Sequence, residues 1–162
     1  MPIRVIQNYS MNDIVNSIHY LLDKASHSQQ VRTMAILMTQ DSHDKISAMY
    51  NYLKSNVSYI HDPIGADGTE IELFVSPVVM ADNYSLGIKP SGDCDDMALL
   101  STALFRSIGI NANVVIVDCI GTGWDHAFSE VYSTSLGRFL DFDLTTDFPV
   151  GWSHPYYKRM TV

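Results

Sequence analysis

The stretch Ser91-Gly92-Asp93-Cys94-Asp95-Asp96 runs directly into the apolar segment Met97–Phe105 and predicts a helix that begins at a cysteine. The first turn of a helix exposes backbone N–H groups, and the positive end of the helix dipole lies there. Both favour a thiolate over a thiol. Cys94 is therefore a candidate nucleophile, provided that the chain also supplies a base and a group that orients the base.

The base and the orienting group are expected on a β-hairpin downstream of this helix. Two segments with alternating polarity follow it, and the loop between them joins Tyr132 to Gly137 in the simplest register. That register puts His126 directly opposite Asp143, with β-carbons roughly 4.5–5.5 Å apart, so the carboxylate can accept a hydrogen bond from the imidazole. Asp141 points to the same face and is the alternative orienting acid, because a two-residue slip exchanges the two aspartates.

These residues together predict nucleophilic catalysis. Cys94 is the nucleophile, His126 takes its proton and later returns it, and Asp143 orients the ring. The backbone N–H of Cys94 is one expected oxyanion donor. The further candidates for the oxyanion site or the cleft are Asn83, Tyr84, Ser91 and Trp124.

Three aspartates surround the cysteine and complicate this interpretation. Asp93, Asp95 and Asp96 favour the start of a helix, yet their charges oppose thiolate formation. Carboxylates are also ligands for hard cations such as calcium. However, the stretch lacks the glycine and glutamate of an EF-hand loop, and neighbouring side chains on a helix point apart. The sequence therefore predicts no metal and no cofactor.

The first part of the chain is expected to be helical. Ser10 to about Ser26 has helical periodicity, and Ser10 with Asp13 resembles a capping box. A second helix is expected over residues 29–38, and a third is expected to begin near Asp41 or Ser42. Residues 59–90 are interrupted by prolines and glycines and are expected to form a long irregular loop that covers or lines a cleft.

Size and composition indicate one globular domain. The chain has 162 residues, of which 46% are hydrophobic and 17% are charged, enough for a core without disulfide or metal support. The net charge of −8, with no run of Lys and Arg, argues against nucleic acid or an anionic membrane as a partner. No apolar run is long enough for a membrane span and no secretion signal is evident. A cytoplasmic location is expected. If a phage encodes the protein, the expected location is the host cytoplasm or the virion.

The motifs around the three candidate residues resemble the core of the transglutaminase-like superfamily, and in particular its small bacterial and phage members. The resemblance covers residues 91–146. It rests on Gly92–Asp96, Gly109–Ala112, His126-Ala127 with Glu130–Tyr132, and Asp143–Thr145, and a weaker similarity extends to Tyr59–Pro63. The chain departs from the family pattern in having Phe128 where Trp is common and Asp-Leu-Thr in place of Asp-Pro-Thr.

The resemblance implies an α+β, papain-like fold, with a helical N-terminal half (residues 1–58) and the cysteine helix packed on an antiparallel sheet. Residues 1–162 then form a single transglutaminase-like domain with its catalytic core at 91–146. It implies a peptidase, isopeptidase or acyl transferase that acts on a protein or peptide through a thioester acyl-enzyme at Cys94. The alternative is a catalytically idle structural or scaffolding protein, for example of a phage particle.

Overall fold

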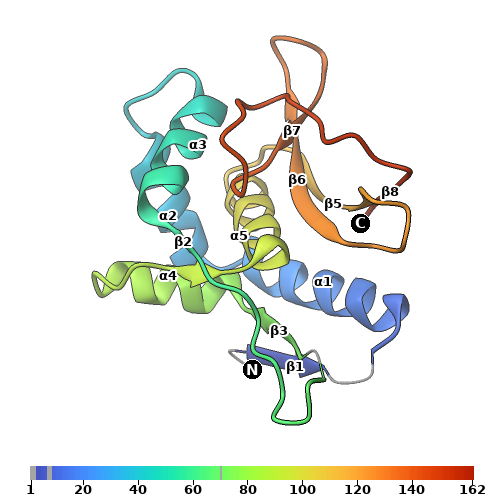
Figure 1. Ribbon diagram of the computed structural model, residues 1–162. Coiled ribbons are helices and arrows are strands. Elements are labelled where there is room, and N and C mark those ends of the chain that lie inside the picture. The colour runs from blue at the N-terminus through green and yellow to red at the C-terminus, as the bar shows by residue number, and fades with distance from the viewer. Residues whose placement is uncertain (1–2, 7–8, 70) are drawn as a thin grey trace.

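The computed structural model describes residues 3–6, 9–69 and 71–162, which form helices around one long helix and a four-stranded sheet. Figure 1 shows that helix, α5, between the sheet on one side and α2, α3 and α4 on the other. The helices are α1 (Met11–Ser26), α2 (Gln29–Thr39), α3 (Lys45–Asn56), α4 (Pro77–Ser85) and α5 (Cys94–Ser107). The strands are β1 (Ile3–Ile6), β2 (Ser58–Tyr59), β3 (Glu72–Val75), β4 (Ser91–Gly92), β5 (Ala112–Asp118), β6 (His126–Ser133), β7 (Arg138–Phe142) and β8 (Lys158–Thr161).

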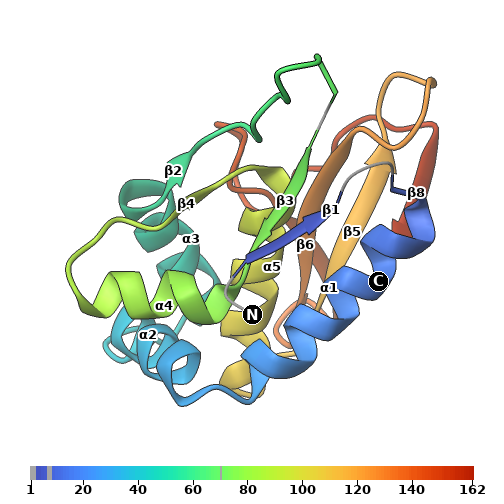
Figure 2. The same ribbon diagram turned by 90° about the horizontal axis from the view of Figure 1, so that it is seen from below.

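The main sheet has the order β7-β6-β5-β8, and every neighbouring pair is antiparallel. Two small sheets lie outside it: β1 pairs antiparallel with β3, and β2 pairs parallel with β4. Figure 2 shows α1 running beside α5, with the β1–β3 pair next to them. The architecture is the expected α+β arrangement, in which the cysteine helix packs on an antiparallel sheet. None of the helices in the described part of the chain is long and apolar enough to cross a membrane.

The centre of the fold is the contact between α5 and the sheet. Nearly every side chain of α5 is buried, in one core with residues from α1, α2, β5 and β6. A hydroxyl cluster fixes this contact: the Ser129 hydroxyl on β6 lies 2.6 Å from that of Ser101 and 2.9 Å from that of Thr102. Ser129 also donates to the Ala98 carbonyl at 2.9 Å. Because buried hydroxyls need partners, this cluster sets how α5 sits on β6.

The expected helices form, with corrections at two places. Ser10 caps α1 and makes the predicted capping box with Asp13. The third helix begins at Lys45, later than predicted, because Asp44 is the residue whose side chain accepts the free N–H of Ser47. The stretch 59–90 is not irregular throughout, since it contains β3 and α4. Pro77 occupies the start of α4, where a proline costs no backbone hydrogen bond.

The predicted hairpin forms, but its register was wrong by two residues. Ser133 pairs with Arg138 and Ser129 with Phe142, so the loop is 134–137 rather than 133–136. Ser133 remains in the strand because its carbonyl accepts from the N–H of Gly137, which adopts φ 66°. In this register the position opposite Asp143 is that of Phe128, and His126 lies diagonally from Asp143.

Gly92, directly before the cysteine motif, is expected to tolerate no side chain. A β-carbon at this position would lie 2.5 Å from the β-carbon of Asp96, far inside a normal contact. Gly92→Ala is therefore expected to lower the free energy of unfolding by about 1–3 kcal/mol, measured by urea denaturation. Ser91→Ala in the same strand is the control, with an expected change within about 0.5 kcal/mol. A Gly92→Ala protein as stable as wild type would contradict this close approach.

Candidate active site

Cys94 is the first residue of α5, as predicted. Asp93 precedes it in an extended conformation as the N-cap residue, but its side chain makes no capping hydrogen bond. Both Cys94 and Cys119 are free and partly buried. The Cys94 thiol therefore lies at the end of the helix where the backbone N–H groups have no partner within the helix.

The thiol contacts the start of β6. β7 ends at Phe142, which pairs with Ser129 of β6. The pairing of β6 with β7 therefore does not extend to Ala127. The backbone N–H of Ala127 donates to the sulfur of Cys94 instead. Cys94 thus meets the residue that directly follows His126 in the chain.

His126 and Asp143 are joined by a hydrogen bond in spite of the shifted register. His126 Nε2 lies 2.7 Å from Asp143 Oδ2. Asp143 follows the last residue of β7, so the local turn rather than the strand ladder directs its carboxylate. Its Oδ1 accepts the N–H and the hydroxyl of Thr145, each at 2.8 Å. Although burial alone raises the pKa of Asp143, hydrogen bonds and charge from His126, together with Thr145, hold it at about 2.

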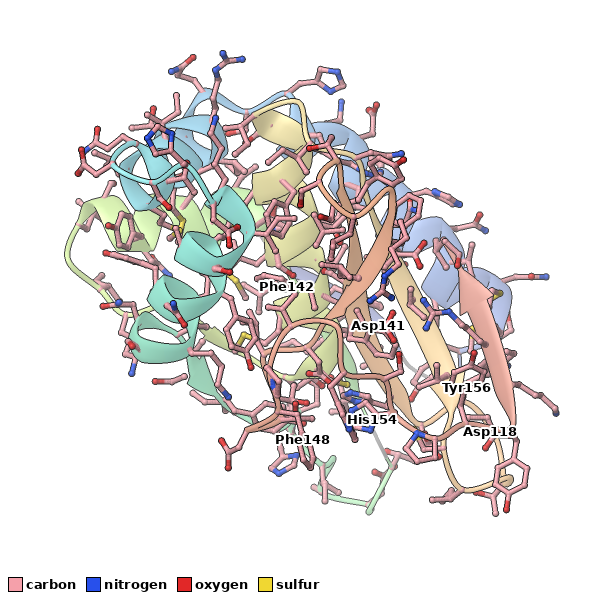
Figure 3. The ribbon with its side chains drawn as sticks, turned by 90° about the horizontal axis from the view of Figure 1, so that it is seen from above. Asp118, Asp141, Phe142, Phe148, His154 and Tyr156 are labelled. Atoms are coloured by element: carbon pink, nitrogen blue, oxygen red, sulfur yellow. The ribbon has the colours of Figure 1, made fainter. Side chains whose placement is uncertain are left out.

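A second histidine reaches the same carboxylate oxygen. His154 Nε2 also lies 2.7 Å from Asp143 Oδ2, and the rings of His126 and His154 are 4.6 Å apart between centroids. His154 was not predicted from the sequence. It follows Asp143 by 11 positions in a segment without regular structure. Its side chain packs edge-on against Trp152, which stacks on Phe148. Figure 3 shows Phe148 and His154 together at this end of the sheet.

The environment of Cys94 opposes ionisation. Burial and the charge of Asp93 raise its pKa to about 12, and the hydrogen bond from Ala127 only partly offsets them. Tyr59, which pairs with Gly92 across the parallel β2–β4 bridge, is also affected by this charge. Burial and the neighbouring Cys94 and Asp93 raise the pKa of Tyr59 to about 12. The tension between the acidic neighbours and the thiolate, which the sequence predicted, is therefore present in the structure.

The acidic cluster beside Cys94 contains two members that sequence analysis did not include, Asp62 and Glu72. Carboxylate oxygens of Asp62, Glu72 and Asp93 lie within 4.8 Å of one another, and so do those of Asp93, Asp95 and Asp96. We call these five residues the carboxylate cluster. β3 brings Glu72 here because Leu73 donates to Asp62 at 2.6 Å and Val75 donates to Asp96 at 2.6 Å.

Burial and mutual proximity disfavour negative charge on the carboxylate cluster. Burial, and then the proximity of Asp93 and Glu72, raise the pKa of Asp95 well above its usual range. Burial chiefly raises the pKa of Asp96 to about 8 and that of Asp62 to about 6. Asp93 Oδ1 and Asp95 Oδ1 are buried and have no hydrogen-bond donor among the described residues. Within the described part of the chain these two oxygens therefore have no compensating donor, whereas backbone N–H groups donate to Asp62 and Asp96.

The other predicted residues have separate surroundings. Asp141 accepts from Ser153 and, at 3.0 Å, from Arg159, which also binds Glu130 at 2.7 Å. Trp124 is exposed in the loop before His126. Ser91 pairs with Ser58 in the β2–β4 bridge.

Asn83 and Tyr84 lie in the last turn of α4, and this end of the helix is the one away from the start of α5 (Figure 1). The Tyr84 hydroxyl there lies 2.5 Å from that of Tyr52. The carbonyl of Asn83 accepts from Leu86 and Ile88 in the turn that follows α4. Tyr84 and Asn83 are thus engaged in contacts of the helical part.

Comparisons with known proteins identify the family and the fold. The family model of the transglutaminase-like superfamily matches residues 29–144. A candidate cysteine protease from Cytophaga hutchinsonii has a similar structure, with a TM-score of 0.53 and 21% identity. The match covers 88% of this chain, which spans about half (49%) of that protein. Calcium-bound LapG of Legionella pneumophila is also similar, with a TM-score of 0.53 and 15% identity over 90% of this chain and 81% of LapG. No curated protein sequence matches the chain.

Proposed function

Because this chain belongs to the transglutaminase-like superfamily, we propose that it is a thiol-dependent amide hydrolase acting on a protein or peptide. Cys94 is the nucleophile, His126 the base and Asp143 the orienting acid. The observation that carries the proposal is the hydrogen bond that the sulfur accepts from Ala127, because Ala127 directly follows a histidine held by a buried aspartate. Superfamily members are generally thiol amidases and peptidases.

The hydrogen bond to Asp143 decides which nitrogen of His126 is the base. A carboxylate only accepts, so Nε2 carries the proton and the Nδ1 lone pair is available for the thiol proton. The Cys94 thiolate then attacks the amide carbonyl carbon, while the backbone N–H of Cys94 stabilises the oxyanion. The C–N bond breaks, the proton on His126 passes to the leaving amine, and a thioester remains on Cys94.

Hydrolysis of the thioester completes the cycle. His126 takes a proton from water, the hydroxide oxygen bonds to the acyl carbon, and the C–S bond breaks to release a carboxylic acid. The proton returns to the sulfur. An amine acceptor in place of water gives acyl transfer. Water, at about 55 M, is the default acceptor unless the cleft excludes it, so we favour hydrolysis.

The same proposal includes a hard divalent cation in the carboxylate cluster. LapG, which has this fold, is described as calcium-bound. The buried oxygens of Asp93 and Asp95 without donors fit such an ion, since calcium takes several carboxylate oxygens. A bound cation supplies positive charge that offsets Asp93 and favours the thiolate of Cys94. The sequence-based prediction of no metal considered three adjacent aspartates, whereas the fold adds Asp62 and Glu72 from other segments.

The raised pKa of Cys94 also supports the alternative of an idle scaffold, and one experiment separates the two. The rate of alkylation of each cysteine by iodoacetamide is measured at one fixed pH, with calcium, by peptide mass spectrometry. We expect Cys94 to react at least about tenfold faster than Cys119, and His126→Ala to remove this difference. Cys119 is the internal control. Cys94 reacting as slowly as Cys119, regardless of His126, favours the scaffold.

A further inference from the structure

Two imidazoles and one carboxylate converge on a single point beside the proposed nucleophile. Nε2 of His126 and Nε2 of His154 each lie 2.7 Å from Asp143 Oδ2. All three donor atoms lie within 4.8 Å of one another. An orienting hydrogen bond for His126 needs only one imidazole, so the second ring is not explained by the proposed reaction.

The donor types and their spacing are those of a zinc site. Zinc binds His nitrogen at about 2.0–2.1 Å and Asp oxygen at about 2.0–2.2 Å, usually with tetrahedral geometry. Two ligand atoms at these distances are roughly 3.3–3.5 Å apart. The two nitrogens therefore need to retreat from Oδ2 by less than about 1 Å, which small rotations of the side chains supply. The carboxylate also balances one of the two positive charges of the ion, and the neutral imidazoles supply lone pairs without adding charge.

The surroundings hold these donors in place. Asp143 is 5% exposed, and both hydrogen bonds from Thr145 go to its other oxygen, which leaves Oδ2 for the two rings. The His154 ring lies 4.7 Å from Trp152, whose ring stacks on Phe148 at 4.1 Å. The side chains of His126 and His154 remain 15% and 22% exposed, so an ion and a water ligand have access. Ligands fixed by their neighbours bind a metal with little reorganisation.

We propose that His126, Asp143 and His154 form a Zn²⁺ site whose occupation switches the active site off. Zinc on Nε2 of His126 takes the place of its proton, so the proton of the neutral ring sits on Nδ1. That nitrogen then has no lone pair for the thiol proton. The inhibitory consequence rests on the proposed function, whereas the binding of zinc does not.

Zinc binding to the full chain is measured by isothermal titration and by competition with a fluorescent zinc chelator. Calcium is present in excess so that the carboxylate cluster does not contribute. We expect one tight site in the wild type. His154→Gln, which keeps an amide N–H for Asp143 but removes the imidazole, is expected to weaken it at least about tenfold. His19→Ala, on the exposed face of α1, is the control and is expected to leave the affinity unchanged.

Any of three results overturns the proposal. The wild type does not bind zinc, His154→Gln has the wild-type zinc affinity, or Cys94→Ala loses zinc binding while the His154 variants retain it. His154→Ala serves as a second variant, and thermal denaturation checks that each variant folds. The inhibitory effect of zinc is tested by measuring the zinc concentration that halves the rate of Cys94 alkylation. This concentration is expected to be at least about tenfold higher in His154→Gln than in wild type. If zinc binding depends on His154 but zinc does not change the reactivity of Cys94, the zinc site is supported and its inhibitory role is rejected. A failure of the proposed hydrolase function leaves the titration result intact.

Discussion

The Cys94→Ala variant is expected to lose at least about 10³-fold in the hydrolysis of p-nitrophenyl acetate relative to wild type assayed with calcium. This activated ester needs no specific recognition, so it transfers its acetyl group to any competent thiolate and releases nitrophenolate. Removing the sulfur removes the only atom proposed to carry the acyl group. The free energy of unfolding is expected to change by no more than about 1–2 kcal/mol, because the thiol is small and lies at the end of α5.

Cys119→Ala is the matched control for this experiment. Cys119 is the other free thiol, and burial with the charge of Asp125 also raises its pKa. It lies after β5, and its backbone N–H is bonded to Asp125 at 2.9 Å. Cys119→Ala is expected to retain the wild-type rate. Equal activity in Cys94→Ala and wild type would assign the acyl group to a different nucleophile.

The second large effect concerns stability against pH in the presence of a chelator. Asp96 and Asp62 have pKa values of about 8 and about 6 in the fold, because burial and neighbouring carboxylates disfavour their charged forms. An unfolded aspartate has a pKa of about 3.9. The folded protein therefore binds more protons than the unfolded chain between about pH 4 and 8, and its stability falls as the pH rises through this window.

The expected loss between pH 5 and 8 is on the order of 2–3 kcal/mol, or a decrease in Tm of roughly 5–10 °C. Asp96 and Asp62 contribute to it, and Asp95, whose pKa is raised well above its usual range by burial, acts in the same direction. Calcium at 100 times its Kd is expected to restore about 2.7 kcal/mol at pH 8. Differential scanning calorimetry with chelator or with calcium measures both. Asp96→Asn is expected to reduce the pH dependence, whereas Asp82→Asn, which changes an exposed acid on α4, is expected to leave it unchanged. A Tm that is constant or rises from pH 5 to 8 in chelator contradicts the repulsion within the cluster.

The parts of the fold that could be predicted depend on local patterns. The start of α5 at Cys94, the capping box of α1 and the existence of the hairpin each follow from residues a few positions apart. The hairpin register failed for a local reason too. Four loop residues were counted correctly, but the positive φ of Gly137 moves the loop one position along the chain.

The parts of the site that could not be predicted come from segments far apart in the sequence. Glu72 reaches the carboxylate cluster only because β3 is tied to Asp62 and Asp96 through backbone N–H groups. His154 reaches Asp143 through a segment without periodicity, so no spacing indicates it. One signal was available for Asp62, since the segment Tyr59–Pro63 resembles one that precedes the cysteine motif in the superfamily. Long-range packing decides the rest.

The loop 134–137 lies at the end of the β6–β7 hairpin opposite to His126 and Asp143 (Figure 1). All four of its residues are exposed, and the orientation of Asp143 is set by Thr145 rather than by the strand ladder. The hairpin tip is therefore a suitable attachment point for a fluorophore, an affinity tag or a surface linker. A label there reports on the protein or immobilises it while the opposite end of the sheet stays open to a large substrate.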